Sequence, residues 1–311
     1  MKAAVGGLAA LLLLAAPAAA ATQNLGLGLG LGDQQDNNRP IDIHADNGIE
    51  WQQNNRVYIA RGNARATRGQ VTVFADTLRA YYRPVGGATP ANVSTGSGSS
   101  QPKKDGSTSS DPVGGSSTEI YRLEADGHVR IATETQTVYG DHAVYDVDQT
   151  LLVVTGNNLK LETPRDTVTA RDSLEWYDNR QLAVARGDAL AVREGKRIRG
   201  DVLTATVEKP PDQASHIQRI DALGHVFVSS QDQIARGDSG VYNLDTGIAT
   251  LAGHVTLTRA DNELRGEYGV VDLNNNVSRL LAAPPNAQTT AARPRVQGLL
   301  IPRGKPAAPT Q

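Results

Sequence analysis

The chain contains no cysteine among its 311 residues, which excludes disulfide cross-links, thiol nucleophiles and cysteine-bound metals. Its stability must therefore come from an apolar core and from backbone hydrogen bonds. Aromatic residues are scarce, at 4%, whereas Val, Thr and Ile recur in short runs that favour strands over helices. The formal net charge of −2 provides no basic field, so we expect no nucleic-acid partner.

Long apolar runs are missing except at the N-terminus. There, Lys2 precedes an apolar stretch through Leu14, followed by small residues at positions 18–20. This layout is typical of a cleaved secretory signal, and the run is shorter than the roughly 20 residues that span a bilayer. We expect residues 1–21 to be a signal peptide and the mature chain to be exported. An uncleaved anchor is the alternative.

Catalytic signatures are also missing. The sequence contains no Gly-x-Ser-x-Gly elbow, no His-Glu-x-x-His pair, no Walker loop and no EF-hand ligand run. Nothing in it identifies an enzyme, so we predict no catalytic residue, no metal ligand and no cofactor.

Three segments carry too little apolar surface to offset the entropy of ordering them. They are a spacer at 22–39 that includes LGLGLGLG, an insert at 84–118 rich in Gly, Ser and Pro, and a C-terminal tail at 283–311. We expect all three to be disordered, except that the apolar residues 296–301 are expected to dock on a sheet edge. The remaining residues, 40–282, are expected to form one β-domain around the insert.

This domain carries a repeat. A glycine followed by a strand-like run recurs every 29 to 37 residues, once the insert is subtracted from the first interval. About 13 residues after each glycine comes a small residue, usually followed by an acid, and then another run. Two strands per unit predict an elongated all-β fold built as an antiparallel meander, with a parallel β-helix as the alternative. The glycines are Gly62, Gly127, Gly156, Gly187, Gly224 and Gly253.

Alternation within the runs separates an apolar face from a polar one. In residues 70–73, QVTV, the two valines share a face, and the same pattern recurs in most units. The apolar face is expected to line an interior. Residues 57–60, VYIA, are apolar on both faces, so their phase cannot be assigned.

Three of the six histidines follow a repeat glycine and precede valine: His128, His225 and His254. The equivalent position elsewhere holds Asn or Asp, and these three residue types share a tolerance of tight turns and positive φ. We interpret them as strand-opening residues rather than metal ligands. The recurring acids, once per repeat, are interpreted in the same way as turn and bulge formers: Asp76, Asp141, Asp201, Asp238 and Glu267.

Arginines and lysines cluster at 56–68 and 193–199. A solvated strand face is the first interpretation, and contact with phosphates of an anionic ligand is the alternative.

The order of these motifs resembles a known family. Residues 41–50, IDIHADNGIE, are followed by ARGNA at 60–64 and VTVFAD at 71–76. This series is similar to that of the periplasmic lipopolysaccharide-transport proteins LptA, also called OstA-like, and residues 120–145 and 217–273 repeat its later elements. The chain is longer than a typical LptA. LptC and the N-terminal domain of LptD share the fold, so a module of either type remains an alternative.

The resemblance implies a V-shaped β-jellyroll of stacked antiparallel strands in the periplasm. Such proteins bind lipopolysaccharide in an apolar groove, associate head to tail, and join an LptC-like inner-membrane protein to an LptD-like outer-membrane protein. Motif matching assigns groove lining to Ile41, Ile43, Val71 and Val73, and alternation alone adds Val129, Ile131, Val226, Val228, Val255 and Leu257. For each of these residues ordinary core packing is the competing interpretation.

Two other functions remain open at this point. An envelope structural β-solenoid would have a closed, dry interior. A carbohydrate-active β-solenoid enzyme would need at least two of the recurring acids within hydrogen-bonding reach of each other.

Overall fold

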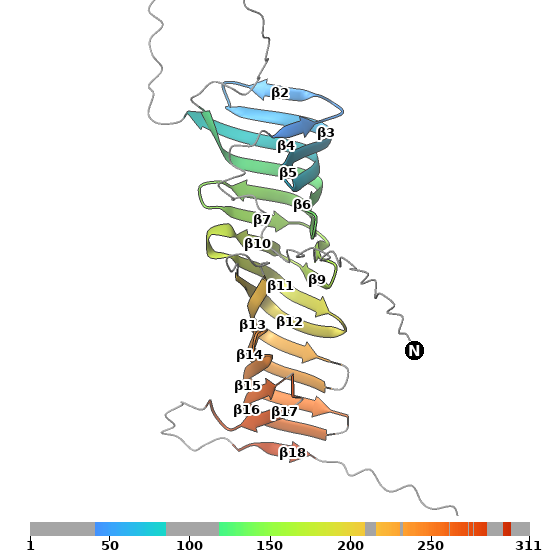
Figure 1. Ribbon diagram of the computed structural model, residues 1–311, viewed down its shortest axis with the longest axis vertical. Coiled ribbons are helices and arrows are strands. Elements are labelled where there is room, and N and C mark those ends of the chain that lie inside the picture. The colour runs from blue at the N-terminus through green and yellow to red at the C-terminus, as the bar shows by residue number, and fades with distance from the viewer. Residues whose placement is uncertain are drawn as a thin grey trace, which may run out of the picture.

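The chain folds into a single elongated stack of antiparallel strands (Figure 1). The computed structural model describes residues 41–84, 118–208, 216–230, 233–260, 262–272, 274–275, 277–284 and 295–299. All pairings between its strands are antiparallel, as the sequence predicts. Within these residues, no helix combines the length and hydrophobicity needed to cross a membrane.

One sheet of 18 strands contains all the described β-structure. The strands are β1 (Asp42–His44), β2 (Ile49–Gln52), β3 (Val57–Arg68), β4 (Val71–Pro84), β5 (Thr118–Ala132), β6 (Thr137–Asp146), β7 (Leu151–Thr155), β8 (Leu159–Glu162), β9 (Asp166–Ala170), β10 (Ser173–Tyr177), β11 (Leu182–Arg193), β12 (Lys196–Glu208), β13 (His216–Ser229), β14 (Gln233–Asn243), β15 (Ile248–Arg259), β16 (Asn262–Asp272), β17 (Val277–Leu281) and β18 (Gln297–Leu299). A short 3-10 turn, η1 (Asp178–Arg180), joins β10 to β11.

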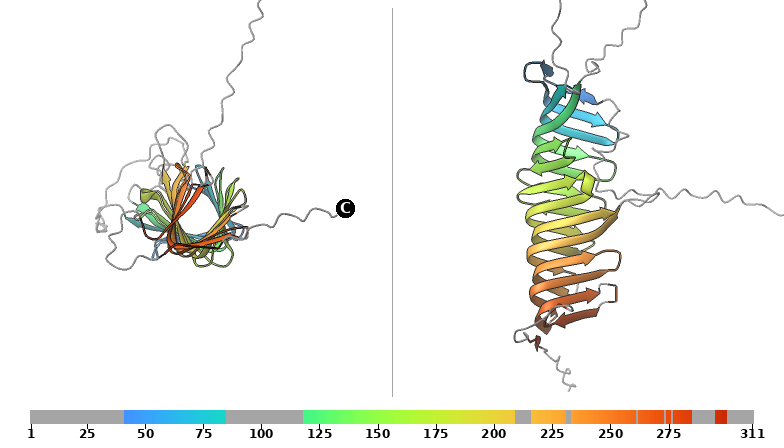
Figure 2. Two further views of the ribbon diagram at one scale, coloured as in Figure 1. Left: turned by 90° about the horizontal axis from the view of Figure 1, so that it is seen from below. Right: turned by 90° about the vertical axis from the view of Figure 1, so that its left-hand side faces the viewer.

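Each long strand runs through two walls of the stack. Wall A contains the halves that pair in line with β2, β7, β10 and β17, and wall B contains the halves in line with β1, β8, β9 and β18. In the middle of the stack, the pairs β7/β8 and β9/β10 each take the place of one long strand. Seen along the axis, the strands curve around a common centre (Figure 2).

The corner between the walls is formed by β-bulges at the repeat glycines. Pairing registers shift across these positions, for example between Asp126 and Val129 and between Leu223 and Val226. Gly127 and His128 have φ of 78° and 46°, and the glycine–histidine pairs at 224–225 and 253–254 repeat these values closely. Two consecutive residues in the left-handed region bend the strand and increase its twist, which turns one wall into the other. The histidines therefore mark the bend of a strand that continues on both sides.

The recurring acids occupy the same corner. The carboxylate of Asp76 accepts a hydrogen bond from His128 Nδ1 at 2.9 Å, and the pairs His225–Asp201 and His254–Asp238 are equivalent, at 2.9 and 2.7 Å. In one unit the sequence repeat aligns Arg171 with the recurring acids, and this alignment is wrong by one residue. Asp172 is the carboxylate that lies against Gly187 there, because β9 and β10 are interrupted at the corner.

Most of the predicted segments lie outside the described residues: the signal peptide, the spacer and the greater part of the insert and tail. The ends of the insert are described, and Pro84 of β4 pairs directly with Thr118 of β5. Within the tail, β18 pairs with β16 at the C-terminal end of the stack (Figure 1). Residues 297–299 of the apolar stretch predicted at 296–301 thus form a strand on the sheet edge, and residues 300–301 lie outside the described residues.

Candidate functional site

The strand register aligns apolar side chains in continuous rows along the interior. On wall B one row runs through the length of the stack, each residue paired with the next. Five residues predicted to line a groove lie in this row, and their positions alternate with outward polar side chains. The row comprises Ile43, Ala66, Val73, Ile131, Val138, Leu161, Val168, Ala191, Ile198, Val228, Ala235, Leu257 and Leu264.

The other predicted lining residues lie at or near the corner. Val129, Val226 and Val255 are fully buried, each directly after a bulge and opposite a glycine of the next strand. Val71 is buried at the start of β4, whereas Ile41 is half-buried and precedes β1. A methyl group at Gly140 would lie 2.5 Å from Val154 Cγ1, and one at Gly266 would lie 2.9 Å from Leu280 Cγ, so both positions need a residue without a side chain.

Residues 57–60 can now be assigned to faces. Tyr58 and Ala60 pair with Ala80 and Leu78, which continue the inward rows of wall A. Val57 and Ile59 point to the other face and are nevertheless buried. Both faces of this segment are covered, which is why alternation of polarity gave no phase.

A cavity of about 210 Å³ opens between the walls at strands β8–β15. Val226 and Val228 are the two predicted residues that line it. Its other apolar contacts come from both walls, and many are small. They include Leu161, Val168, Leu174, Ala183, Ala185, Ala191, Ile198, Leu203, Ala205, Ile217, Ile220, Ala222, Gly240, Tyr242, Ala249 and Leu251. The remaining predicted residues are absent from this lining. Ile41 and Ile43 are half-buried near the end of the stack, and the other six pack in the core or against it.

Sequence reasoning missed the alanine-rich part of the lining. Residues 183–191, AVARGDALA, alternate as strictly as the valine runs, with Ala183, Ala185, Ala189 and Ala191 on the inward face. Alanine is only weakly hydrophobic, so the signal that could have found them is their regular spacing at every second residue. Their small volume is what leaves the cavity open.

Charged groups lie at the wall B margin of the cavity. Arg193 donates to Asp166, with 2.6 Å between Nη2 and Oδ2, and Lys196 lies exposed at the start of the next strand. The hydrogen bond that Arg193 donates to Asp166 is the main cause that raises the pKa of Arg193 above its ordinary value. Ser229 and Ser230 add hydroxyl groups on the same side. The margin therefore offers fixed cations and donors beside an apolar interior.

The first basic cluster, at 56–68, is partly neutralised by ion pairing. Arg61 binds Glu50 at 2.6 Å on the exposed face. In the second cluster Arg199 similarly donates to Asp188, with 2.6 Å between Nη2 and Oδ2. Exposed ion pairs of this kind contribute little stability. They support the interpretation of both basic clusters as solvated faces of strands.

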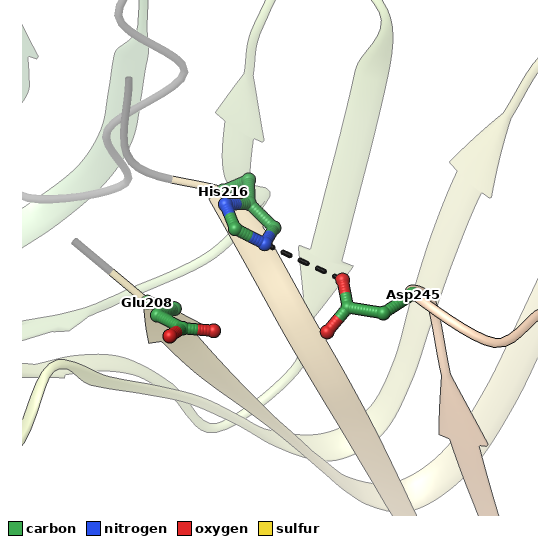
Figure 3. A group of neighbouring side chains, drawn as sticks. All are labelled: Glu208, His216 and Asp245. Carbon is green, nitrogen blue, oxygen red and sulfur yellow. Dashed lines mark ion pairs between the residues drawn. The ribbon is translucent and has the colours of Figure 1, made fainter. Parts of the chain in front are cut away.

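Four of the five recurring acids face the bulge of the neighbouring strand. Asp141 accepts from the backbone of Asn157 at 2.7 Å, and Asp76, Asp201 and Asp238 contact histidines. Their role is therefore to hold the corner, as interpreted from the sequence. Elsewhere in the described part of the chain, one group of three possible metal ligands comes together: Glu208, His216 and Asp245 (Figure 3).

The fold and the cavity define a stacked, bent β-sheet protein with an apolar interior between two walls. Residues 42–172 and 167–277 each match the family described as LptA/(LptD N-terminal domain) LPS transport protein. The two matches together cover more than half of the chain, which therefore belongs to this family. Its role is in lipopolysaccharide transport, and the family is a transport module rather than an enzyme family.

Among solved structures, the chain is similar to LptH, the LptA-homologous periplasmic component of the lipopolysaccharide transport device from Pseudomonas aeruginosa. The identity is 22%, the alignment covers 44% of this chain and 95% of that one, and the TM-score is 0.38. No curated protein gives a significant match.

Proposed function

We propose that the chain binds the acyl chains of lipopolysaccharide between its walls and bridges the inner and outer membranes in the periplasm. The observation that carries this proposal is the apolar cavity at β8–β15, which opens onto uninterrupted inward rows of apolar side chains.

The physical requirement of such a carrier is modest. Each methylene removed from water contributes about 0.8 kcal/mol, so acyl chains bind without a specific polar partner. The cavity, at about 210 Å³, is smaller than the roughly 300–1,000 Å³ of typical ligand pockets. It accommodates part of a lipid, and the inward rows extend the apolar surface above and below it. Arg193 and Lys196 at the margin suit the phosphates of the headgroup.

The bridging part of the proposal rests on the two ends of the stack. At one end the outermost strands are β1 and β2, and at the other they are β17 and β18 (Figure 1). Their outer edges carry exposed apolar residues, Trp51 on β2, Val277 on β17 and Leu299 on β18. Such edges accept another strand by β-augmentation. We propose that they join LptC-like and LptD-like partners and a second copy head to tail.

Photocrosslinking tests the lipid-binding part directly. A photoreactive residue at Val228 or Val73 points inward, and one at Thr72 is the matched outward control. Lipopolysaccharide should crosslink to the two inward positions and not to the control. Crosslinking only from Thr72 would reject the proposal and favour a structural solenoid with a dry interior.

A further inference from the structure

Three side chains with metal-ligating atoms meet at the wall A rim of the stack. Glu208 ends β12, His216 begins β13, and Asp245 lies in the turn between β14 and β15 (Figure 3). One ligand atom from each lies within 4.8 Å of the other two, and His216 Nε2 is 3.4 Å from Asp245 Oδ1. The residues come from three different elements, and the antiparallel register brings them together.

Several acids in the described part of the chain are neutralised by an arginine, and others, such as Asp201 and Asp238, pair with a single histidine. Asp148, Asp172 and Asp221 each bind an arginine at 2.9 Å or less. Glu208 instead accepts from the amide of Gln218 at 2.8 Å, and Asp245 faces the imidazole of His216. The two carboxylates thus lie beside the neutral amide of Gln218 and the imidazole of His216, and imidazole binds metals in its neutral form.

We infer that Glu208, His216 and Asp245 form a site for one divalent transition-metal ion, with Zn²⁺ the best match. Imidazole and carboxylate together suit zinc, with bonds of about 2.0–2.2 Å, whereas Mg²⁺ and Ca²⁺ prefer oxygen ligands alone. Ligand atoms around one such ion lie about 3.5 Å apart, so the observed group must contract only slightly. Three protein ligands leave a fourth position for water or an anion.

A bound ion would connect the ends of strands that build the cavity. The neighbours of these ligands in sequence, Ile217 and Leu244, line the cavity, and Val207 is buried in the core. Glu208 pairs with His216 in the register of β12 and β13. The ion would therefore fix the wall A rim without entering the apolar interior. This inference is independent of the proposed lipid function.

Isothermal titration of the full chain with ZnCl₂ at neutral pH tests the site. We expect one ion per chain, with affinity at least about tenfold lower in His216→Ala and in Asp245→Asn. The matched control is His254→Ala, which removes another exposed histidine that binds a single carboxylate, and it should leave the affinity unchanged. As a second readout, Zn²⁺ should raise the Tm of the wild type but not of His216→Ala.

Three results would overturn the inference. They are no Zn²⁺ uptake at about millimolar concentration, full affinity in a folded His216→Ala variant, and equally tight Mg²⁺ binding that does not depend on His216. Circular dichroism of each variant verifies that the β-sheet is retained, and the residue is half-exposed, so its removal should not prevent folding.

Discussion

The two halves of the stack follow one backbone plan but fill it with side chains of different size. Along the inward row of wall A, strands β5–β10 carry large residues, whereas strands β11–β15 include three alanines. The two sets are Leu123, Tyr145, Leu152 and Trp176 on strands β5–β10, and Ala183, Ala205, Ile220, Tyr242 and Ala249 on strands β11–β15. The cavity reaches Ala183 and its successors but none of Leu123, Tyr145, Leu152 and Trp176.

Side-chain volume, and not a change of fold, therefore sets the position of the cavity. A close-packed interior leaves room only where residues are too small to meet. Burial in the filled half is strong enough to raise the pKa of the Tyr145 hydroxyl to about 12. If the volume of the inward side chains alone distinguishes the two halves, substitutions that change this volume should act differently in each half.

The largest effect is expected where a bulky side chain fills the first half. Trp176 is 4% exposed, and Trp176→Ala should lower the free energy of unfolding by about 3–5 kcal/mol and extend the cavity toward β7. Trp51→Ala is the control, because Trp51 is 51% exposed, and it should cost less than about 1.5 kcal/mol. Urea denaturation measures both. Equal losses would show that Trp176 does not fill the interior.

Enlarging a buried alanine should have different consequences in the two halves. Ala143 is buried against Ala125 and Val154, so Ala143→Leu should destabilise the protein by about 1–3 kcal/mol. Ala205 lines the cavity, so Ala205→Leu should change stability little but weaken the binding of a fluorescent apolar probe. If Ala205→Leu leaves probe binding intact, the cavity is not where apolar ligands bind.

The bulges should respond identically in both halves, because the backbone plan is shared. Gly127→Ala and Gly224→Ala each place a methyl group against the Asp76 or Asp201 carboxylate and keep a residue at positive φ. Gly195 also has positive φ but nothing within 4 Å of an added methyl group. All three changes should cost about 1–2 kcal/mol for the left-handed backbone. The two bulge variants should lose about 0.5–1.5 kcal/mol more, since the corner hydrogen bond is disturbed.

The smallest effect concerns protonation at the corner. Hydrogen bonds that His128 and His254 donate to Asp76 and Asp238 raise the pKa of each histidine above the ordinary 6.5, one in each half. Because the folded pKa is raised, these pairs stabilise the fold below the unfolded pKa, and the contribution is lost as pH rises through the folded pKa. NMR titration should show both raised values, and Asp238→Asn should lower the pKa of His254 only. An unchanged value would contradict the pairing.

The sequence predicted the repeating two-strand unit because both of its signals are local. The geometry of a single bend requires positive φ at Gly127 and His128 and a small residue before Asp141. The inward direction of Val73 and Val228 follows from alternation in the same way. These features depend on neighbours along the chain, so a single sequence contains them.

Features that depend on pairing across the stack were not predictable. The cavity arises from alanines on several strands, and an alanine such as Ala205 carries no hydrophobic signal of its own. Glu208, His216 and Asp245 are brought together by register over 38 positions of sequence. The misplaced unit at 170–171 has the same origin, because the break between β9 and β10 leaves no local mark.

We propose that acyl chains lie between the walls in the second half of the stack. Contacts between lipopolysaccharide with ¹³C-labelled acyl chains and the methyl groups of the protein test it most directly, as intermolecular nuclear Overhauser effects. We expect contacts to Ile198 and Ala205, which line the cavity, and none to Leu223, which is 63% exposed on the outer face. Contacts to Leu223 without contacts to Ile198 and Ala205 would contradict it.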